Sequence, residues 1–141
     1  MVIMALEYDK PLPLPANSKL TQPYWDGAKR HELMMQRCLK CAQIFFYPRE
    51  VCPECLSPEL EWTKLSGRGR LHSYTVVHQP ANKGFMEDVP YIFAMIQLNE
   101  GPKMVSNLVE IDSSEVEVDM MVEAVFDDVT EEITLIKFKP A

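Results

Sequence analysis

The chain has 141 residues, of which 47% are hydrophobic, and its formal net charge is −7. This length and composition suit one medium or two small globular domains. No uncharged apolar run approaches the roughly 20 residues of a membrane-spanning helix, so the sequence predicts a protein that does not cross a membrane.

Charge is divided unevenly along the chain. Residues 28–70 carry eight Lys/Arg and five Asp/Glu, a net of +3, whereas residues 71–141 carry four and thirteen, a net of −9. The acidic C-terminal half would repel a phosphate backbone, because non-specific nucleic-acid affinity rests on Lys and Arg. Nucleic acid is therefore a disfavoured partner, although an ordinary solvated surface also explains the acidic residues.

Residues 1–32 are predicted to form an N-terminal arm and a short helix. Three alternating prolines favour an extended arm over residues 1–20. Thr21 is expected to cap a helix that continues to about His31. Gly27 weakens this helix by about 1 kcal/mol relative to alanine, so the helix needs to pack against its own domain or a partner protein.

Two pairs of cysteines follow in residues 33–65. Each pair has two intervening residues, and ten residues separate the pairs. Two such pairs can close a tetrahedral site of four thiolates around one Zn²⁺. Because four protein ligands leave no open coordination position, the sequence predicts a structural and not a hydrolytic metal. The expected ligands are Cys38, Cys41, Cys52 and Cys55.

The alternatives to a zinc site are disulfides, four unrelated thiols and an iron site. Disulfides are disfavoured because the first residues do not resemble a secretion signal, which also predicts a cytoplasmic location. Iron suits four thiolates as well. A rubredoxin-type iron site usually has glycine directly after each pair, however, and this chain has Ala42 and Leu56 there.

Residues 33–65 are expected to form a zinc ribbon of three strands. About 35 residues bury too little apolar surface to offset their backbone entropy, whereas a four-thiolate zinc site contributes on the order of 10–16 kcal/mol. Four aromatic residues are predicted to form the ribbon's small core, with a ligand-binding surface as the alternative. They are Phe45, Phe46, Tyr47 and Trp62. The strands are Leu33–Arg37, Ile44–Tyr47 and Leu60–Leu65.

Residues 66–141 are predicted to form a five-stranded barrel of the OB type, with a sandwich as the alternative, because closure removes exposed strand edges. Gly67 and Gly69 suit a bend or a close backbone approach where the barrel begins. The near-continuous apolar run Tyr91–Leu98 suggests a strand buried on both faces. The five strands are Leu71–His78, Tyr91–Leu98, Lys103–Val109, Met121–Asp127 and Glu132–Phe138.

The connection Gln79–Pro90 is twelve residues long, a length typical of functional or mobile loops. It contains Phe85 and Met86 beside a glycine. These side chains would suit a partner or an acyl chain; alternatively, Phe85 packs over one end of the barrel.

An ordered set of short motifs gives a family resemblance over residues 21–138. The set is Cys38-x-x-Cys41, Pro48-Arg49, Cys52-Pro53-x-Cys55, Ser66-Gly67-x-Gly69, Ser73–Val77, Pro90-Tyr91 and Leu98-x-Glu100-Gly101. Together these motifs resemble the family in which a rubredoxin-like zinc ribbon is fused to an acyl-CoA-associated OB-fold domain. Two positions depart from the pattern, because Ala42 and Asp119 stand where glycine is common.

The resemblance implies a non-catalytic accessory or scaffold protein that accompanies a thiolase or another acyl-CoA enzyme and that binds acyl-CoA. Arginine forks match phosphate oxygens, although ordinary solubilising charges are the alternative. The acyl-CoA-binding candidates are Arg49, Arg68, Arg70, Lys83 and Phe85.

No catalytic constellation is expected. His72 and His78 should face the same side of one strand as Tyr74 and Val76, but six residues span nearly 20 Å, too far to share a proton or an ion. Two other functions stay open at this point. One is single-stranded nucleic-acid binding, which ribbons and OB folds both perform. The other is electron transfer by iron in the four-thiolate site.

Overall fold

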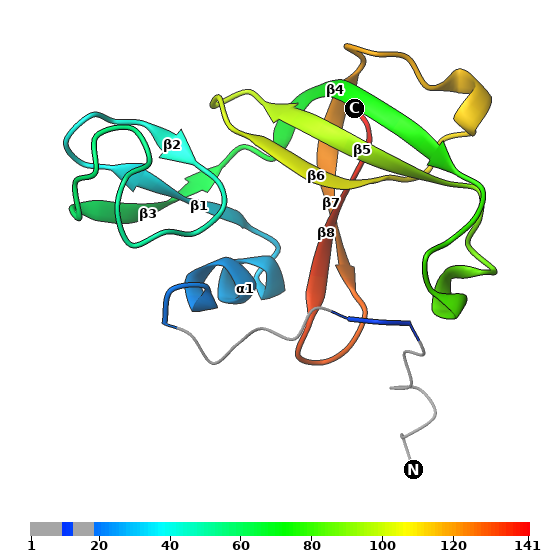
Figure 1. Ribbon diagram of the computed structural model, residues 1–141, viewed down its shortest axis with the longest axis horizontal. Helices are drawn as coiled ribbons and strands as arrows, with labels where there is room; N and C mark the ends of the chain where they lie inside the picture. Colours follow the sequence, from blue (N-terminus) through cyan, green and yellow to red (C-terminus); the bar gives the residue numbers. More distant parts are fainter. Residues whose placement is uncertain (1–9, 13–18) are drawn as a thin grey trace.

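A computed structural model of the protein describes residues 10–12 and 19–141. A small three-stranded sheet and one short α-helix lie beside a closed five-stranded barrel (Figure 1). The predicted mainly β fold with one N-terminal helix is confirmed within this described part of the chain, and barrel closure excludes the sandwich. The arm predicted over residues 1–20 lies outside the described residues except at 10–12 and 19–20.

Helix α1 spans Gln22–Lys29. Thr21 occupies the N-cap position, but its side chain makes no capping hydrogen bond, so this part of the prediction is wrong. The helix ends before His31, whose φ of 62° is left-handed. A Cβ at Gly27 would lie 2.4 Å from Met34 Cγ, so the residue that weakens the helix also lets it pack closely on the next strand.

The ribbon sheet has the strand order β2-β1-β3, and both pairings are antiparallel. Its strands are β1 (Leu33–Cys38), β2 (Ile44–Phe45) and β3 (Leu60–Leu65). Only Phe45 of the four predicted core aromatics packs in the ribbon's own buried cluster. Phe46 packs against the barrel core, Trp62 is half-buried and Tyr47 is 54% exposed. The sulfur cluster occupies the centre that an aromatic core would otherwise fill.

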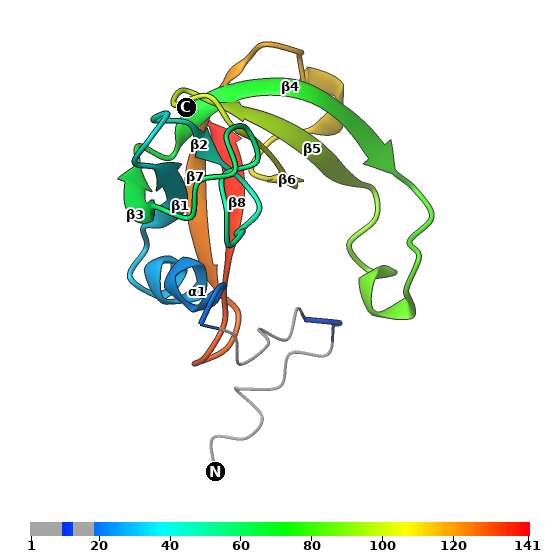
Figure 2. The same ribbon diagram turned by 60° about the vertical axis from the view of Figure 1, so that its left-hand side comes forward.

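The barrel has the strand order β4-β5-β6-β8-β7. Its pairings are antiparallel except for β6 with β8, which run parallel and share one residue pair, Leu108 with Phe138. Figure 2 shows β4 and β5 curving over one side while β7 and β8 close the other. The strands are β4 (Arg68–Val77), β5 (Tyr91–Leu98), β6 (Lys103–Leu108), β7 (Met121–Asp128) and β8 (Thr134–Pro140).

Two glycines explain how the ribbon leads into the barrel. Gly67 has a φ of +76°, which turns the chain between β3 and β4. Gly69 lies so close to β5 that an added Cβ would be 2.4 Å from the Gln97 carbonyl oxygen. The predicted bend is thus at Gly67, and the predicted close backbone approach is at Gly69.

Replacing Gly69 with alanine is expected to lower the free energy of unfolding by about 2–3 kcal/mol, because backbone atoms of β5 must move to admit the methyl group. Urea denaturation followed by circular dichroism measures the change. Ser73→Ala, at an exposed position of the same strand, is the control and should stay within about 0.5 kcal/mol of the parent. Equal stabilities for the two variants would contradict the close packing.

Two expectations about the barrel strands are wrong. Tyr91–Leu98 is not buried on both faces, because buried residues alternate with outward ones and Phe93 is 46% exposed. In β4, the register shifts between Leu71 and Ser73. This bulge at His72 breaks the alternation, so exposed His72 does not share a face with Tyr74, which pairs with buried Ala94.

One hydrophobic core joins the ribbon to the barrel. Ala28 of α1, Leu33 and Met35 of β1 and Leu65 of β3 belong to the same buried cluster as the barrel residues. His31 adds a contact at the end of α1: its ring stacks on Phe126 at 5.2 Å, and Nε2 lies 2.9 Å from an Asp128 carboxylate oxygen. The division at residues 32/33 and 65/66 stays a prediction, because no break in packing marks it.

Short 3₁₀ turns occur in two connections of the barrel. One, η2 (Lys83–Phe85), lies between β4 and β5, and the other, η3 (Ser113–Glu115), lies between β6 and β7. In η2, the Asn82 side chain accepts a hydrogen bond from the Gly84 N–H at 2.8 Å. Within the described part of the chain, no helix has the length and apolar character needed to span a bilayer.

Candidate metal centre

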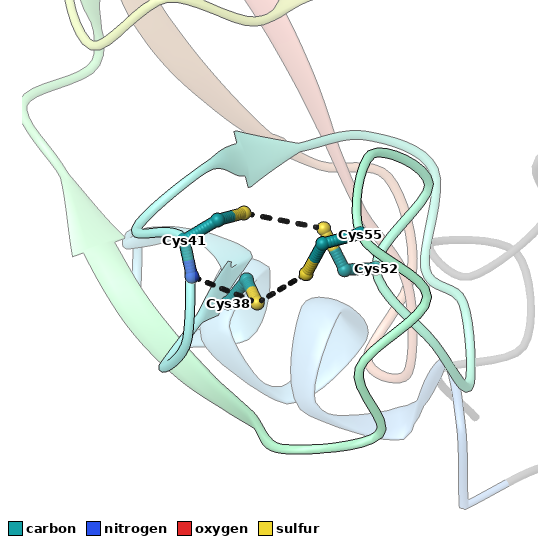
Figure 3. Close-up of side chains that lie close together, drawn as sticks. All are labelled: Cys38, Cys41, Cys52 and Cys55. Carbon is teal, nitrogen blue, oxygen red and sulfur yellow. Dashed lines mark hydrogen bonds between the residues drawn. The ribbon is translucent and has the colours of Figure 1, made fainter.

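The four cysteines predicted as ligands converge at the tip of the ribbon (Figure 3). The Sγ atoms of Cys38 and Cys55 are 3.6 Å apart, as are those of Cys41 and Cys52, and all four lie within 4.8 Å of one another. Zn–S bonds of about 2.3 Å place the sulfurs of a tetrahedral site about 3.8 Å apart. The spacing therefore fits one ion bound by all four sulfurs.

The two pairs have matching backbone geometry. The Cys38 N–H bonds to the Gln43 carbonyl and the Cys52 N–H to the Ser57 carbonyl, both at 2.9 Å. The Lys40 and Cys41 N–H groups lie 3.4 Å from Cys38 Sγ. In the second pair, the Glu54 N–H lies 3.4 Å from Cys52 Sγ. N–H groups aimed at sulfur stabilise thiolate charge, as a metal site of this type requires.

The N–H groups near Cys38 Sγ also affect the acidity of the Cys38 thiol. The Cys41 N–H, with a smaller contribution from the Lys40 N–H, lowers the pKa of the Cys38 thiol to about 6 despite desolvation. Cys38 and Cys52 are buried, Cys55 is half-buried and Cys41 is exposed. Phe45 and Leu60 pack against the buried sulfurs. With four thiolates as ligands the coordination shell is full, so the ion holds the fold and presents no open position for a reactant.

The residues after the two pairs adopt the backbone conformation that usually favours glycine. Ala42 has a φ of 66° and Leu56 a φ of 63°, and each N–H bonds to the carbonyl of the first cysteine of its pair at 2.9 Å. The departure from glycine thus leaves the turn intact, at a cost of roughly 1–2 kcal/mol per residue.

Leu56→Gly is expected to raise the free energy of unfolding of the metal-bound protein by about 1 kcal/mol, because the left-handed strain at an exposed side chain is removed. Chemical denaturation of the zinc-loaded protein measures it. Leu39→Gly is the matched control, since Leu39 is also exposed in a knuckle but is not among the residues with positive φ. A stabilisation of similar size in both variants would show that backbone strain is not the cause.

Three of the predicted acyl-CoA-binding residues are exposed near the ribbon. Arg49 lies between β2 and β3, and its backbone N–H and C=O are both hydrogen-bonded by the buried Gln36 side chain, at 2.7 and 2.8 Å. Arg68 and Arg70 point outward from the first residues of β4. In the described part of the chain, none of these guanidinium groups makes an ion pair.

The other two predicted residues lie beyond the opposite end of β4. Lys83 and Phe85 belong to η2, and about 23 Å of strand separates Arg70 from Val77 at a rise of 3.3 Å per residue. Phe85 is half-buried, and its ring packs against Tyr91 at 6.2 Å. The structure therefore groups the five residues into two places; their role in acyl-CoA binding stays a prediction.

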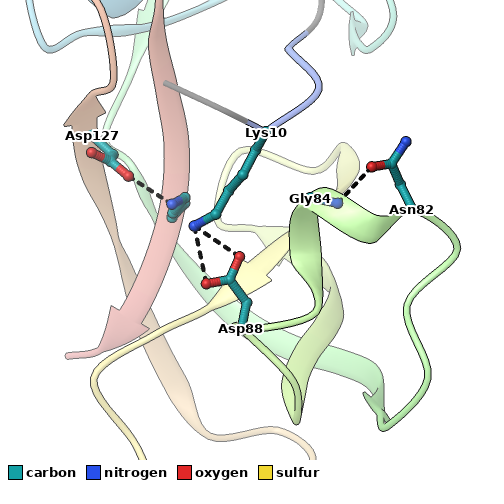
Figure 4. A network of polar contacts seen from close by, with 6 residues as sticks. Lys10, Asn82, Gly84, Asp88 and Asp127 are labelled. Atoms are coloured by element: carbon teal, nitrogen blue, oxygen red, sulfur yellow. Dashed lines mark hydrogen bonds and ion pairs between the residues drawn. The ribbon is translucent and has the colours of Figure 1, made fainter. Parts of the chain in front are cut away.

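Contacts with the N-terminal arm hold this distal loop in place. Lys10 Nζ lies 2.8 Å from an Asp88 carboxylate oxygen, and the two side chains point toward each other beside η2 (Figure 4). A Cβ at Gly84 would lie 2.9 Å from Pro11 Cδ. The arm and the loop thus pack directly on one another at residues 10 and 11.

Comparison with known proteins identifies the family. The model of the ChsH2 rubredoxin-like zinc ribbon domain matches residues 25–61, and that of the ChsH2 C-terminal OB-fold domain matches residues 62–127. A DUF35 domain-containing scaffold protein of Methanocaldococcus jannaschii is 40% identical over 130 residues, which are 86% of this chain and 92% of the relative. The chain belongs to the DUF35 scaffold protein family.

Two further relatives are named as parts of enzymes. The solved structure titled "Ltp2-ChsH2(DUF35) aldolase" contains a chain that is 32% identical, with a TM-score of 0.81 over 90% of this chain and 98% of that one. The benzoylsuccinyl-CoA thiolase subunit BbsA of Geobacter metallireducens is 36% identical over 72 residues, 51% of this chain and 47% of the relative. The resemblance read from the sequence is confirmed as a family membership.

Proposed function

We propose that this DUF35 protein is a non-catalytic accessory subunit that docks onto a thiolase-type or other acyl-CoA enzyme and helps to bind its CoA thioester. The observation that carries the proposal is the similarity, over nearly the whole of that chain, to the DUF35 part of an aldolase assembly. The name of the benzoylsuccinyl-CoA thiolase subunit BbsA points to the same class of partner.

Exposed apolar side chains of the ribbon support docking there. Four large hydrophobic residues at and between the knuckles are between 39% and 70% exposed: Leu39, Tyr47, Val51 and Leu56. Exposed apolar residues that gather in one region mark protein contacts more often than singly scattered ones do. The metal fixes the two loops that carry them, so zinc acts at a distance from any reaction by holding the docking surface in shape.

The arginines near the ribbon, which form no ion pair with the residues that the structure describes, support binding of CoA phosphates. Arg68 and Arg70 are two residues apart on the outer side of β4, so their guanidinium groups project in the same direction. They precede the acidic residues 71–141, which would repel phosphates that approach the rest of the barrel. We therefore expect the CoA nucleotide to bind at the ribbon end of the barrel, with Arg49 as an additional donor.

Two measurements test the proposal. Tagged protein purified from its native cell should retain an acyl-CoA enzyme. The double variant Leu39→Ser, Leu56→Ser should lose this enzyme, while Lys40→Ala should keep it.

Calorimetry with the parent protein should detect binding of an acyl-CoA, and the double variant Arg68→Ala, Arg70→Ala should weaken this binding about tenfold or more. The proposal fails if no such enzyme is retained and no CoA thioester binds.

Zinc as the bound metal is part of the same proposal. A colourless protein with one zinc per chain is the expected result of elemental analysis and absorption spectroscopy. A red protein with visible charge-transfer bands and one iron per chain would replace the structural zinc with an electron-transfer site. A reducing compartment such as the cytoplasm keeps the four thiols available to either metal.

A further inference from the structure

A cavity of about 370 Å³ lies where the helix, the ribbon and the barrel meet. Tyr24 and Trp25 of α1 form one side, and the ribbon loop Phe46–Pro48 forms the second. Met104 and Val105 of β6 and Ile136 of β8 form the third. Figure 1 shows these segments around one point, with α1 below the ribbon and beside the lower half of β8. We call this space the junction cavity.

The junction cavity arises from an incomplete seam in the barrel. Strands β6 and β8 pair at Leu108 and Phe138 only. Nearer the ribbon, the remaining link is side chain to backbone, since Ser106 Oγ donates a hydrogen bond to the Ile136 carbonyl at 2.7 Å. Helix α1 and the loop after β2 cover the apolar side chains that this seam leaves uncovered. The site therefore requires both parts of the molecule.

The electrostatics of the junction cavity exclude a charged occupant. Among the described residues of its wall, Lys137 is the one that carries a charge, and its ammonium group already lies 2.6 Å from an Asp127 carboxylate oxygen. Burial, with a smaller contribution from Tyr47, raises the pKa of Tyr24 to about 12, so its phenol stays neutral. Phosphates and nucleotides would enter without a free counter-charge.

Among the described residues, the cavity wall contains one buried polar atom without a hydrogen-bond partner, and in this rotamer that atom does not face the open space. Thr21 lies in its wall, and the buried hydroxyl oxygen of Thr21 has no hydrogen-bond partner among the residues that the structure describes. Rotation about χ1 exchanges the positions of the threonine methyl and hydroxyl groups. A ligand oxygen beside Thr21 would therefore receive a hydrogen bond that the protein itself leaves unmade, and such a group is costly to leave unpaired.

We propose that the junction cavity binds the acyl group of a thioester, in the form of a neutral and mainly apolar chain that carries a keto or hydroxyl oxygen. Its volume is at the lower end of the roughly 300–1,000 Å³ of small-molecule sites, which suits an acyl group and not a whole CoA. This inference rests on the proposed function, because it assigns the acyl part of the ligand whose phosphates the ribbon-side arginines would bind.

The chain provides a local reporter of occupancy. Its two tryptophans are Trp25, in the cavity wall, and Trp62, on β3. In a Trp62→Phe variant, emission comes from Trp25 alone. Octanoyl- and 3-oxooctanoyl-N-acetylcysteamine, which carry the acyl thioester without the nucleotide, should change that emission saturably, whereas CoA alone should not. Affinity should rise about fourfold per added methylene from butanoyl to octanoyl.

Two variants locate the site. Thr21→Val should weaken binding of the 3-oxooctanoyl probe about three- to tenfold and leave octanoyl binding within twofold, and Thr75→Val, on the exposed face of β4, should alter neither. Val105→Trp, at a partly exposed position in the wall, should fill the cavity and abolish binding of both probes in calorimetry. Circular dichroism confirms that each variant is folded.

Two results would overturn the inference: an unchanged Trp25 emission at the solubility limit of the octanoyl probe, or octanoyl binding that survives Val105→Trp. The outcomes are separable from those of the proposed function. Binding of the nucleotide-free probes without partner capture or acyl-CoA affinity would keep the cavity and reject the accessory role. Capture of the enzyme and binding of acyl-CoA, with no response from Trp25, would keep the accessory role and reject the acyl site in the cavity.

Discussion

Removing the metal is expected to unfold the ribbon. A chelator removes all four bonds between the metal and the thiolates, and Cys52→Ala removes one of them. The small cluster of Cys38, Phe45 and Cys52 buries too little surface to hold β1–β3 without these bonds. Apparent zinc-binding free energies of roughly 10–16 kcal/mol in such sites indicate the size of the loss. Limited proteolysis should cut between residues 38 and 60, and hydrogen exchange should lose its protection in β1 and β3.

The loss should extend to the barrel, because Leu33, Met35 and Leu65 of the ribbon are part of the barrel's core cluster. The barrel of the metal-free protein is therefore expected to unfold at lower urea concentration than that of the loaded protein, although its strands stay paired in the absence of denaturant. Lys40→Ala, which changes an exposed side chain in the same knuckle, is the control and should retain the metal. Unchanged protection of the ribbon after complete metal removal would refute the structural role.

Phe138→Ala is expected to lower the free energy of unfolding by about 3–5 kcal/mol. Phe138 is fully buried, and it connects the three strands at the seam: it pairs with Leu108 of β6 and Ala124 of β7, and its carbonyl accepts a hydrogen bond from the Val109 N–H at 2.7 Å. Because β6 and β8 share one residue pair, a cavity at this point weakens the closure of the barrel as well as its packing.

Urea denaturation of the zinc-loaded protein measures this effect, and Phe93→Ala is the matched control. Phe93 is the same residue type on another strand of the barrel, β5, but it is 46% exposed on the outer face. Its truncation should cost about 1 kcal/mol or less. If the two phenylalanine variants were equally stable, Phe138 would not be the closing element of the seam.

The two effects bear on function in different ways. Loss of the metal disorders the loops that carry Leu39 and Leu56, so capture of the partner enzyme should fail first. Loss of Phe138 loosens β6 against β8, so the junction cavity should be the part that changes. The proposed docking surface and the proposed acyl site thus have separate structural supports.

Local sequence patterns determined much of the fold. The two cysteine pairs predicted that four sulfurs would converge, because two intervening residues make a turn that aims both sulfurs at one point, and the four sulfurs do lie within 4.8 Å of one another. The strands Leu60–Leu65 and Tyr91–Leu98 have the predicted bounds. The short turn between Tyr91–Leu98 and β6 is local as well, since the Gly101 N–H bonds to the Leu98 carbonyl at 3.0 Å. These features depend on residues close together in the chain.

Expectations that needed distant residues were less accurate. The continuous apolar run of β5 could not reveal that Phe93 faces outward, because the burial of a strand depends on what covers it. The bulge at His72 has no signature in the sequence. It exchanges the inward and outward positions of the β4 residues that follow it. Phe46 was expected in the ribbon core, but the docking of the ribbon on the barrel moved it to the interface.

The sequence by itself determined the four candidate metal ligands, the order of helix and strands and the family, because thiolate chemistry and backbone preference act over a few residues. Only the tertiary structure decided that Arg68 and Arg70 lie at one end of β4 and Lys83 and Phe85 beyond the other, and that Tyr24, Phe46 and Ile136 surround one cavity. The physical reason is that such groupings arise from strand pairing and packing between residues far apart in the chain, such as Tyr24 and Ile136, and no local pattern records these contacts.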